Sequence, residues 1–395
     1  MRRLSPLAAV LQVVALGCGS DSTGSFPAGT FTSVSSGFRN TCGILTEGVG
    51  FCWGDNGVGQ IGNGNFAVRD TLPRAIVGLI VFTSIDGNLG HTCGIRAGGR
   101  AYCWGASSDG ALGNDSTTTS PIPVEVSGGL NFKAIAVGWT HSCGLTTQGV
   151  AYCWGNNDFG KLGADTTASA VGTPVAVAGG HVFRSIAAGQ NHTCAVEVSD
   201  TLFCWGSNSY GQLGTGDPDS HGTPTPVAGA LKFRGVGPGY VHSCGITTAG
   251  AVYCWGHNDF GQLGDSTFVS TTSPVKVKTT RGFSAVSVGA NHSCAFDATG
   301  ALYCWGNNGS SQLAGSAAQS CTTPPGDSVP CTSSPIRSAD GLSFSSIRAG
   351  AFHTCAVGRS GGLHCWGAND YGQIGNGSAG ASVIVPFPVA DPAID

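Results

Sequence analysis

Residues 239–264 read GYVHSCGITTAGAVYCWGHNDFGQLG, and this stretch decides the fold because its pattern recurs along the chain. Its most regular element, Cys-Trp-Gly, returns seven times at intervals of 51, 50, 51, 50, 50 and 61 residues. Another cysteine stands ten residues before each copy. Repeat periods near 50 residues are typical of an array built from one supersecondary unit.

Each repeat predicts four short strands, which we name A to D in chain order. Strand A carries Phe-x-x-[Ile/Val], strand B follows the first cysteine, strand C ends in Cys-Trp, and strand D carries Pro-x-x-Val. The repeat contains much Gly, Thr and Val and no long 3.6-residue apolar stripe, so strands are favoured over helices. A closed ring protects the edges of such sheets. The expected fold is therefore all-β, a seven-bladed β-propeller of about 50-residue, four-stranded repeats over residues 31–395.

The turn between strands B and C predicts the register of that hairpin. If the two cysteines of a repeat face each other, the turn has three residues, and its third residue must tolerate a left-handed backbone. Gly or Asp stands there in every repeat, at Gly48, Gly99, Gly149, Asp200, Gly250, Gly300 and Gly361. Strand A ends on Gly or Asn, which also predicts a positive-φ corner at Gly37, Asn88, Gly138, Gly189, Gly239, Gly289 and Gly350.

Opposed cysteines lie within disulfide range, so one disulfide per blade is expected. Sixteen cysteines pair by position, and the chain's seventeenth is Cys18. The predicted pairs are Cys42–Cys52, Cys93–Cys103, Cys143–Cys153, Cys194–Cys204, Cys244–Cys254, Cys294–Cys304, Cys321–Cys331 and Cys355–Cys365. Zinc is the rival reading, because a histidine precedes most first cysteines by two residues. No repeat has the Cys-x-x-Cys spacing of a zinc site, so no metal is predicted.

The composition limits the function classes. Among 395 residues there are 65 glycines and 17 cysteines, only 10% of residues are charged, and the net charge is −4. No basic stripe exists that could neutralise phosphates, so nucleic acid is not an expected partner. Seventeen cysteines do not suit a reducing cytosol unless they bind metal.

The first residues resemble a secretion signal. A basic start at Arg2 and Arg3 precedes an apolar run from Leu7 to Leu16 and then Cys18. We expect residues 1–17 to be a signal peptide of lipoprotein type, and residues 18–30 to be a lipidated Cys18 followed by a flexible tether. The alternative is an ordinary signal peptide that leaves Cys18 inert or removed.

The repeat resembles the regulator of chromosome condensation repeat, most fully in residues 239–264. Asn40, Ser107, Ser311 and Ala314 depart from that pattern. The resemblance implies a seven-bladed propeller, and the paired cysteines look like a secreted bacterial variant. Guanine-nucleotide exchange on a small GTPase is the best-known activity of this family. It requires a cytosolic or nuclear location, which the signal and the cysteines oppose.

No catalytic residues are predicted, because no nucleophile motif, phosphate loop or zinc-protease motif occurs. No cofactor is predicted either. Histidines recur once per repeat at His91, His141, His192, His242, His292 and His353. A catalytic group is needed once, so we expect these rings to be structural and to bond backbone groups near the A–B corner. A proton-responsive ring is the alternative.

The A–B and C–D connections should emerge on one face of the ring, and loops on a rigid scaffold often carry function. Aromatic residues fall in these connections, and they are the predicted partner-binding residues: Phe38, Trp139, Tyr240, Phe352, Phe159, Tyr210, Phe260 and Tyr371. The alternative is that they cap neighbouring blades. Repeat six adds about eleven residues within 314–334, and this insert should stand on the same face, fixed by Cys321–Cys331.

The predicted function is a non-catalytic, extracytoplasmic binding scaffold that presents one loop face to a protein or glycan of the cell envelope. The protein is expected to be a monomer that meets the membrane only through a lipid anchor. One alternative is a nucleotide exchange factor. Another is a carbohydrate-active enzyme that works in the central channel.

Overall fold

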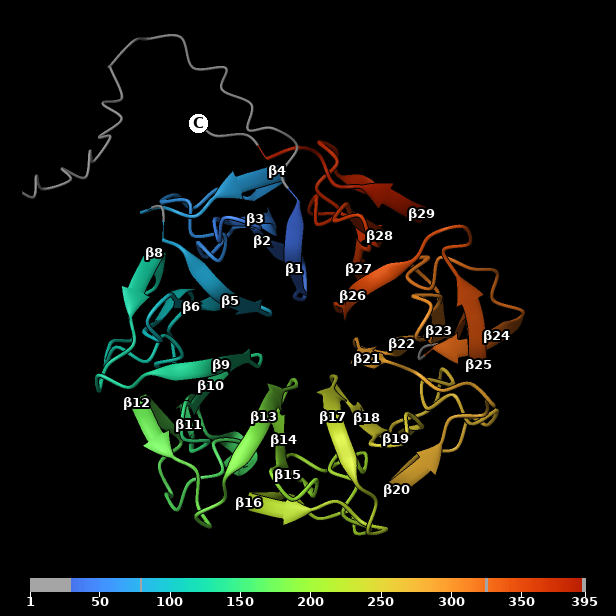
Figure 1. The fold of residues 1–395 in the computed structure, drawn as a ribbon, viewed down its shortest axis with the longest axis horizontal. Coiled ribbons are helices and arrows are strands. Elements are labelled where there is room, and N and C mark those ends of the chain that lie inside the picture. The colour runs from blue at the N-terminus through green and yellow to red at the C-terminus, as the bar shows by residue number, and fades with distance from the viewer. Residues whose placement is uncertain (1–29, 79, 324–325, 393–395) are drawn as a thin grey trace, which may run out of the picture.

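Seven β-sheets surround a central axis in the computed structural model, which describes residues 30–78, 80–323 and 326–392 (Figure 1). The expected signal peptide, the lipidation of Cys18 and the tether up to residue 29 lie outside the described residues. Within these residues, no helix has the length and apolar character needed to span a bilayer.

Each blade is an antiparallel sheet in which strands A, B, C and D follow each other from the axis outward (Figure 1). The A strands are β1 (Phe31–Ser36), β5 (Phe82–Gly87), β9 (Phe132–Val137), β13 (Phe183–Ala188), β17 (Phe233–Pro238), β21 (Ala285–Val288) and β26 (Phe344–Ala349). The B strands are β2 (Asn40–Leu45), β6 (His91–Arg96), β10 (His141–Thr146), β14 (His192–Glu197), β18 (His242–Thr247), β22 (His292–Phe296) and β27 (His353–Gly358).

The C strands are β3 (Gly50–Asp55), β7 (Ala101–Gly105), β11 (Ala151–Asn156), β15 (Leu202–Gly206), β19 (Val252–Gly256), β23 (Leu302–Asn307) and β28 (Leu363–Asn369). The D strands are β4 (Arg69–Ala75), β8 (Ser120–Glu125), β12 (Ala170–Ala176), β16 (His221–Pro226), β20 (Thr271–Lys276), β25 (Asp327–Ser338) and β29 (Gly380–Pro388). A 3-10 turn, η1 (Asp158–Gly160), lies between β11 and β12. The insert in blade 6 adds a fifth strand, β24 (Gln319–Thr323), outside β25. The predicted seven-bladed propeller is confirmed.

The predicted register of the B–C hairpin is confirmed. Cys42 lies opposite Cys52, and the amide of Leu45 donates to the carbonyl of Val49 across a three-residue turn. The third turn residue has a positive φ in all seven blades, from 68° at Asp200 to 90° at Gly99. All eight predicted cysteine pairs are disulfides.

Each hairpin disulfide packs between two blades. The Cys42–Cys52 disulfide of blade 1 shares a buried core with Trp104 of blade 2. The Cys355–Cys365 disulfide of blade 7 shares one with Trp53 of blade 1. The seven tryptophans of Cys-Trp-Gly are all fully buried. Strand C therefore buries both faces, one under its disulfide and one under its tryptophan, as stacked blades require.

The prediction of a positive-φ corner at the end of strand A is wrong. None of the seven corner residues has a positive φ. A Cβ atom on Gly189 would instead lie 2.3 Å from the carbonyl oxygen of Gly239, and one on Gly239 would lie 2.4 Å from that of Gly289. Glycine suits six of the seven corners because the corners of successive blades touch through their backbones, and Asn88 of blade 2 is the exception.

A repeated hydrogen-bond network joins each blade to the next. The carbonyl oxygen of Gln212 accepts from the Trp255 indole and from the Ser243 hydroxyl, both 2.9 Å away in the following blade. His192 Nε2 lies 2.8 Å from the same hydroxyl. Because Ser243 gives its one proton to the carbonyl, His192 must donate through Nε2. The histidines are structural, but their partner is a hydroxyl of the next blade and not the expected backbone group.

The same contacts close the ring between the two ends of the chain. His353 Nε2 lies 2.9 Å from Thr41 Oγ1, and the Trp53 indole donates to the carbonyl of Gln373 over 3.0 Å. Blade 7 thus meets blade 1 as any blade meets its successor. The closed ring leaves every blade interface buried.

Candidate binding face and central pocket

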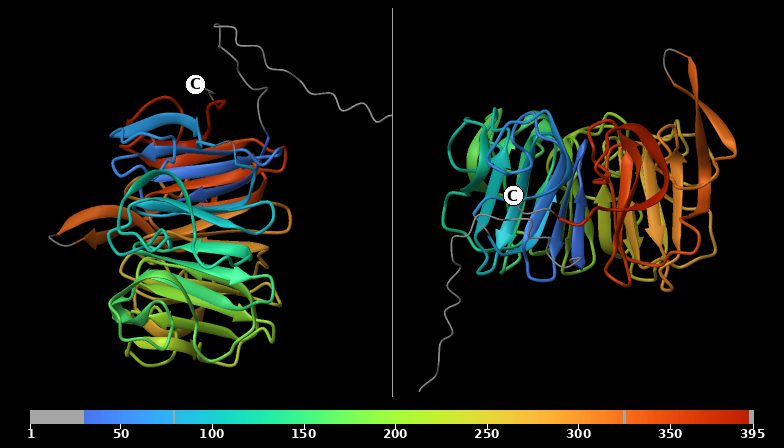
Figure 2. Two further views of the ribbon diagram at one scale, coloured as in Figure 1. Left: turned by 90° about the vertical axis from the view of Figure 1, so that its left-hand side faces the viewer. Right: turned by 90° about the horizontal axis from the view of Figure 1, so that it is seen from above.

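The A–B and C–D connections emerge together on one side of the ring, which we call the loop face. The β24–β25 hairpin of blade 6 rises beyond the other blades on this side (Figure 2). On the opposite side, the amide of Thr46 donates to the carbonyl of Thr30, so the described chain begins beside the B–C turns. The central pocket and four of the predicted aromatics lie on or near the axis.

Four corner aromatics meet over the axis. Phe38 of blade 1 stacks on Tyr240 of blade 5, with ring centroids 6.0 Å apart and planes 3° apart. Phe38 also makes edge contacts with Trp139 at 5.9 Å and with Phe352 at 5.6 Å. Trp139 and Tyr240 meet edge-on at 5.0 Å. We call these four rings the aromatic plug.

The plug is packed within and open on top. Phe38, Trp139 and Tyr240 are half-buried, whereas Phe352 is 36% exposed. Burial raises the pKa of the Tyr240 hydroxyl, and the nearby Trp139 and Arg39 only partly offset it. The sequence left open whether these aromatic side chains cap the blades or face solvent. The four side chains do both, because they cap the centre of the propeller and present an apolar surface to solvent.

Arg39 joins the plug to a fifth predicted aromatic, Tyr371. Its guanidinium lies 4.9 Å from the centre of the Phe38 ring and 4.4 Å from that of Tyr371. Arg39 Nη1 also donates to the Tyr371 hydroxyl over 3.0 Å. Sequence reasoning missed Arg39, although it is the one charged residue in any of the seven A–B connections.

The remaining predicted aromatics lie away from the plug. Phe159 is 53% exposed and Tyr210 is 48% exposed, the latter with its ring edge-on to His257 at 4.9 Å. Phe260 is buried beneath the blade 6 hairpin, against Cys321 and Cys331. Phe260 therefore belongs to the support of that hairpin, and its assignment to the partner-binding surface is corrected.

Lys161 replaces the glutamine that most blades carry at this position. In five blades a glutamine at this position accepts the backbone N–H two residues earlier, as Gln262 does from Phe260 over 2.9 Å. Lys161 has no acceptor to offer, and Phe159 has a φ of 62°, whereas Asp109 of blade 2, where Ala111 also lacks an acceptor, has no positive φ. The Lys161 ammonium is buried instead, donating to Thr140 Oγ1 at 3.1 Å and Asn191 Oδ1 at 3.0 Å. Burial lowers its pKa to about 8.

The connections of the loop face are acidic. The C–D connections hold nine aspartates and, apart from the buried Lys161, no Lys or Arg, while Arg39 is the one charged residue of the A–B connections. These are Asp109, Asp115, Asp158, Asp165, Asp217, Asp219, Asp259, Asp265 and Asp370. The plug is thus an apolar centre inside an acidic rim.

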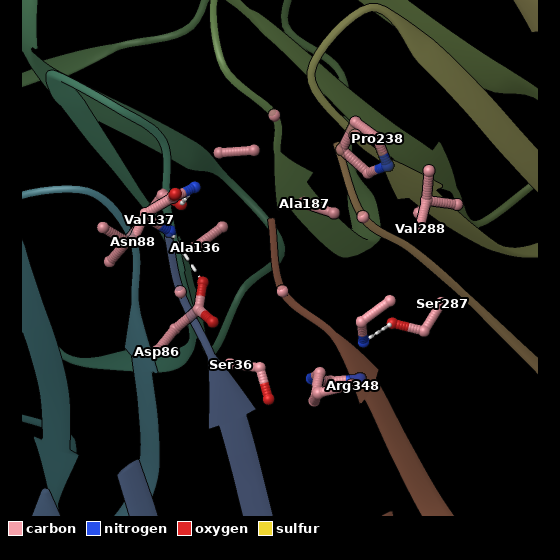
Figure 3. A pocket seen from close by; sticks show the side chains of 18 of the residues that line it. Ser36, Asp86, Asn88, Ala136, Val137, Ala187, Pro238, Ser287, Val288 and Arg348 are labelled. Atoms are coloured by element: carbon pink, nitrogen blue, oxygen red, sulfur yellow. Dashed lines mark hydrogen bonds between the residues drawn. The ribbon is translucent and has the colours of Figure 1, made fainter. Parts of the chain in front are cut away.

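A pocket of about 260 Å³ lies on the axis among the A strands, and Tyr240 of the plug lines it. Figure 3 shows Arg348, Ser36 and Asp86 next to one another along the wall of this pocket, which continues through Ala136, Ala187, Pro238 and Val288, with the polar Asn88 and Ser287 among them. Asp86 is the one carboxylate among the described residues that line it. Burial raises the Asp86 pKa, and Arg348 is the largest of the influences that oppose this rise.

The sixteen cysteines that the structure describes all form disulfides, so none of them is a free thiolate that could bind zinc. Within the described ranges, no group of three or more His, Cys, Asp or Glu side chains is arranged to hold a metal ion.

Residues 13–326 match the family model of the RCC1-like domain, and residues 344–373 match that of the regulator of chromosome condensation (RCC1) repeat. The ultraviolet-B receptor UVR8 of Arabidopsis thaliana is 29% identical over 196 residues, which are 47% of this chain and 43% of the receptor. The chain therefore matches less than half the length of that relative.

Solved structures share the fold. Prp20p from Saccharomyces cerevisiae, studied for its binding to Gsp1p and histones, superposes with a TM-score of 0.76 at 20% identity, covering 91% of this chain and 87% of Prp20p. Human WBSCR16 gives 0.76 at 18% identity, with coverages of 86% and 94%. The CRINKLY WD40 ectodomain of the Arabidopsis thaliana receptor kinase ACR4 gives 0.54 at 20% identity, with coverages of 86% and 98%.

Proposed function

The chain belongs to the RCC1-like domain family. We propose that it is a non-catalytic binding scaffold and that its loop face docks a protein partner. The eight disulfides suit an oxidising compartment outside the cytoplasm. The proposed localisation is therefore the cell envelope or the exterior.

The observation that carries this proposal is the aromatic plug. Phe38, Trp139, Tyr240 and Phe352 come from four different blades, of which only blades 1 and 7 are neighbours, yet they form one surface at the centre of the loop face. The equivalent corners of blades 4 and 6 carry Gln190 and Ala290, so the fold does not need an aromatic there. Aromatic and arginine side chains at the centre of a face are typical anchors of protein interfaces.

The rim indicates the charge of the partner. Nine aspartates lie in the C–D connections of blades 2 to 5 and 7, whereas the Arg and Lys residues at this end of the blades are Arg39, the buried Lys161 and Arg69, which donates to the carbonyl of Asp370. Complementary charge speeds association and fixes orientation more than it raises affinity. The partner should therefore offer an apolar or aromatic knob within a surface rich in Lys and Arg.

We also propose that acylated Cys18 anchors the chain. The first described residue, Thr30, lies beside the B–C turns, where the Phe31 amide donates to the carbonyl of Gly361. A tether that enters there would hold the loop face away from the membrane. The intact mass of the protein from its native cells tests this: acyl groups on a chain that begins at Cys18 are expected, and an unmodified chain would contradict the anchor.

The other candidate functions have less support. A glycan would stack on a free ring face, but the plug rings cover one another. Likeness to Prp20p at 20% identity shows the fold alone, so nucleotide exchange rests on no residue of this chain. A glycosidase needs two carboxylates, whereas the described pocket lining supplies Asp86 alone.

The proposed interface is tested by mutating the plug. Trp139→Ala combined with Tyr240→Ala should abolish capture of a protein that wild type binds in purified form with one-to-one stoichiometry. Val182→Ala combined with Val198→Ala serves as the matched control, since these exposed apolar residues lie on the opposite side, where the Val198 amide donates to Val182. Equal capture by wild type and both variants would overturn the assignment of the face.

A further inference from the structure

The pocket beneath the plug is divided into a polar side and an apolar side. Arg348 of blade 7, Ser36 of blade 1 and Asp86 of blade 2 follow one another on neighbouring blades (Figure 3). Blades 3 to 6 contribute the aliphatic side chains of the wall, which are Ala136, Val137, Ala187, Pro238 and Val288 among others, and the wall also holds the polar groups of Asn88, Tyr240 and Ser287. A ligand of this pocket should therefore be polar along one edge and aliphatic along the other.

The Asp86 carboxylate is held by two hydrogen bonds and can still accept more. Its Oδ1 accepts the Ser35 hydroxyl at 2.9 Å, and its Oδ2 accepts the amide of Val137 at 2.8 Å. Each carboxylate oxygen can accept two hydrogen bonds, so both can still receive a donor. Ser35 in turn accepts the Gly87 amide at 3.0 Å, which fixes the carboxylate between three blades.

Arg348 and Ser36, which lie near Asp86 on the pocket wall, have hydrogen-bonding groups without a good partner among the described residues. Arg348 is exposed to solvent within the channel, and its guanidinium makes one long contact, 3.4 Å, with the carbonyl of Ile347. Across the described chain, Asp86 and Arg348 do not come within ion-pair distance of each other. The Ser36 hydroxyl is buried, and the described residues give it no hydrogen-bond partner.

Unlike charges thus stand on either side of a hydroxyl without touching, at the edge of a small cavity that also has aliphatic side chains in its wall. We propose that this pocket binds a small aliphatic α-amino acid. Arg348 would receive the carboxylate, Asp86 the ammonium group, and the Ala, Val and Pro side chains of blades 3 to 6 the apolar side chain. Net charge balances, because a zwitterion meets one cation and one anion. Water already reaches Arg348, so the site is open to exchange.

The probes are L-leucine, 4-methylpentanoate, which lacks the ammonium group, and 3-methylbutylamine, which lacks the carboxylate. Isothermal titration with the full chain should show leucine binding at least about tenfold more tightly than either analogue, because each analogue loses one of the two charge-assisted contacts. Glycine should bind more weakly than leucine, since it leaves the aliphatic wall empty. Equal affinity for the three probes, or no heat from leucine at millimolar concentration, would overturn the proposal.

Substitutions separate the two charge contacts. Arg348→Gln should remove the preference for leucine over 3-methylbutylamine and leave the preference over 4-methylpentanoate. Asp86→Asn should do the reverse, although it can also loosen the contacts to Ser35 and Val137. Arg359→Gln is the matched control, because this arginine binds the carbonyl of Ala298 beside a B–C turn, away from the pocket. If Arg348→Gln binds leucine as wild type does, the assigned site is wrong.

Discussion

Phe38 and Tyr240 stack with parallel rings, their centroids 6.0 Å apart, although they come from blades 1 and 5 and lie 202 positions apart in the sequence. Blades 1 and 5 are not neighbours in the ring, so no strand pairing joins them. The contact shows that the corner side chains reach the axis and close the loop-face end of the channel. It also makes one surface of residues that look unrelated in sequence, which is why the plug can serve as a docking centre.

Gly189→Ala should destabilise the protein by about 2–3 kcal/mol, because its Cβ would overlap the carbonyl oxygen of Gly239 and the ring of His192. Denaturant unfolding with the disulfides intact measures this loss. Gly282→Ala is the control, since a Cβ there meets nothing within 4 Å and its φ is not positive. A Gly189→Ala protein as stable as the control would show that the blade corners do not touch.

Acid should weaken the ring strongly. Burial lowers the pKa of His192, His292 and His353 to about 3 and that of His91 to about 4. The unfolded chain has ordinary histidines with a pKa near 6.5, so it binds more protons than the fold below that pH. The stability is thus full above pH 6.5 and falls as the pH approaches the folded values. Each buried histidine should cost about 2 kcal/mol at pH 5.

Unfolding by denaturant at pH 7.5 and pH 5.0 measures this effect. His192→Asn is the matched variant, because Asn40 already occupies the same position in blade 1. It should take up close to one proton fewer on unfolding at pH 5. Stability that stays level between the two pH values would contradict the buried neutral histidines.

Lys161→Gln should raise stability at neutral pH by roughly 1–2 kcal/mol, because it removes a buried ammonium and restores the acceptor for the Phe159 amide. With a folded pKa of about 8 and an unfolded value near 10.5, Lys161 also makes wild-type stability rise between those pH values. The variant should lack that rise, whereas Lys276→Gln, at an exposed lysine, should keep it. A destabilised Lys161→Gln protein would contradict the expected cost of burying the Lys161 ammonium.

The two kinds of disulfide should respond differently to removal. Cys321→Ser with Cys331→Ser should increase hydrogen exchange only in residues 319–338 and around Phe260, since that bridge supports the blade 6 hairpin. Cys143→Ser with Cys153→Ser should lower global stability by about 2–3 kcal/mol, because a ten-residue loop loses its constraint at a blade interface. Equal effects of the two variants would show that the hairpin is part of the ring's core.

The features that recur in every blade could be predicted from the sequence, because seven copies of the repeat show the same residue pattern. The three-residue turn, the facing cysteines and the double burial of strand C all follow from period and turn chemistry. Gly189 and its equivalents misled for a physical reason: glycine suits a positive φ and a close backbone contact alike. Only the positions of neighbouring blades distinguish the two causes.

The site depends on residues that break the repeat, and their meeting is a long-range effect. Asp86 and Arg348 occupy one strand-A position, where the other five blades carry Ser35, Ala136, Ala187, Gly237 and Ser287. Two opposite charges at a position otherwise filled by small residues are a signal that sequence reasoning could have used. The plug was predicted residue by residue, but its convergence on the axis required the ring, and the burial of Phe260 required the fold of the insert.

Site-specific photo-crosslinking in native cells tests the proposed loop-face interface most directly. A benzophenone amino acid at Phe352, the most exposed ring of the plug, should crosslink one discrete protein, and adding Trp139→Ala with Tyr240→Ala should abolish that product. The same probe at Val198, 63% exposed on the opposite side, should not form it. A product that forms from Val198 and not from Phe352, or that persists without the plug, would contradict the account.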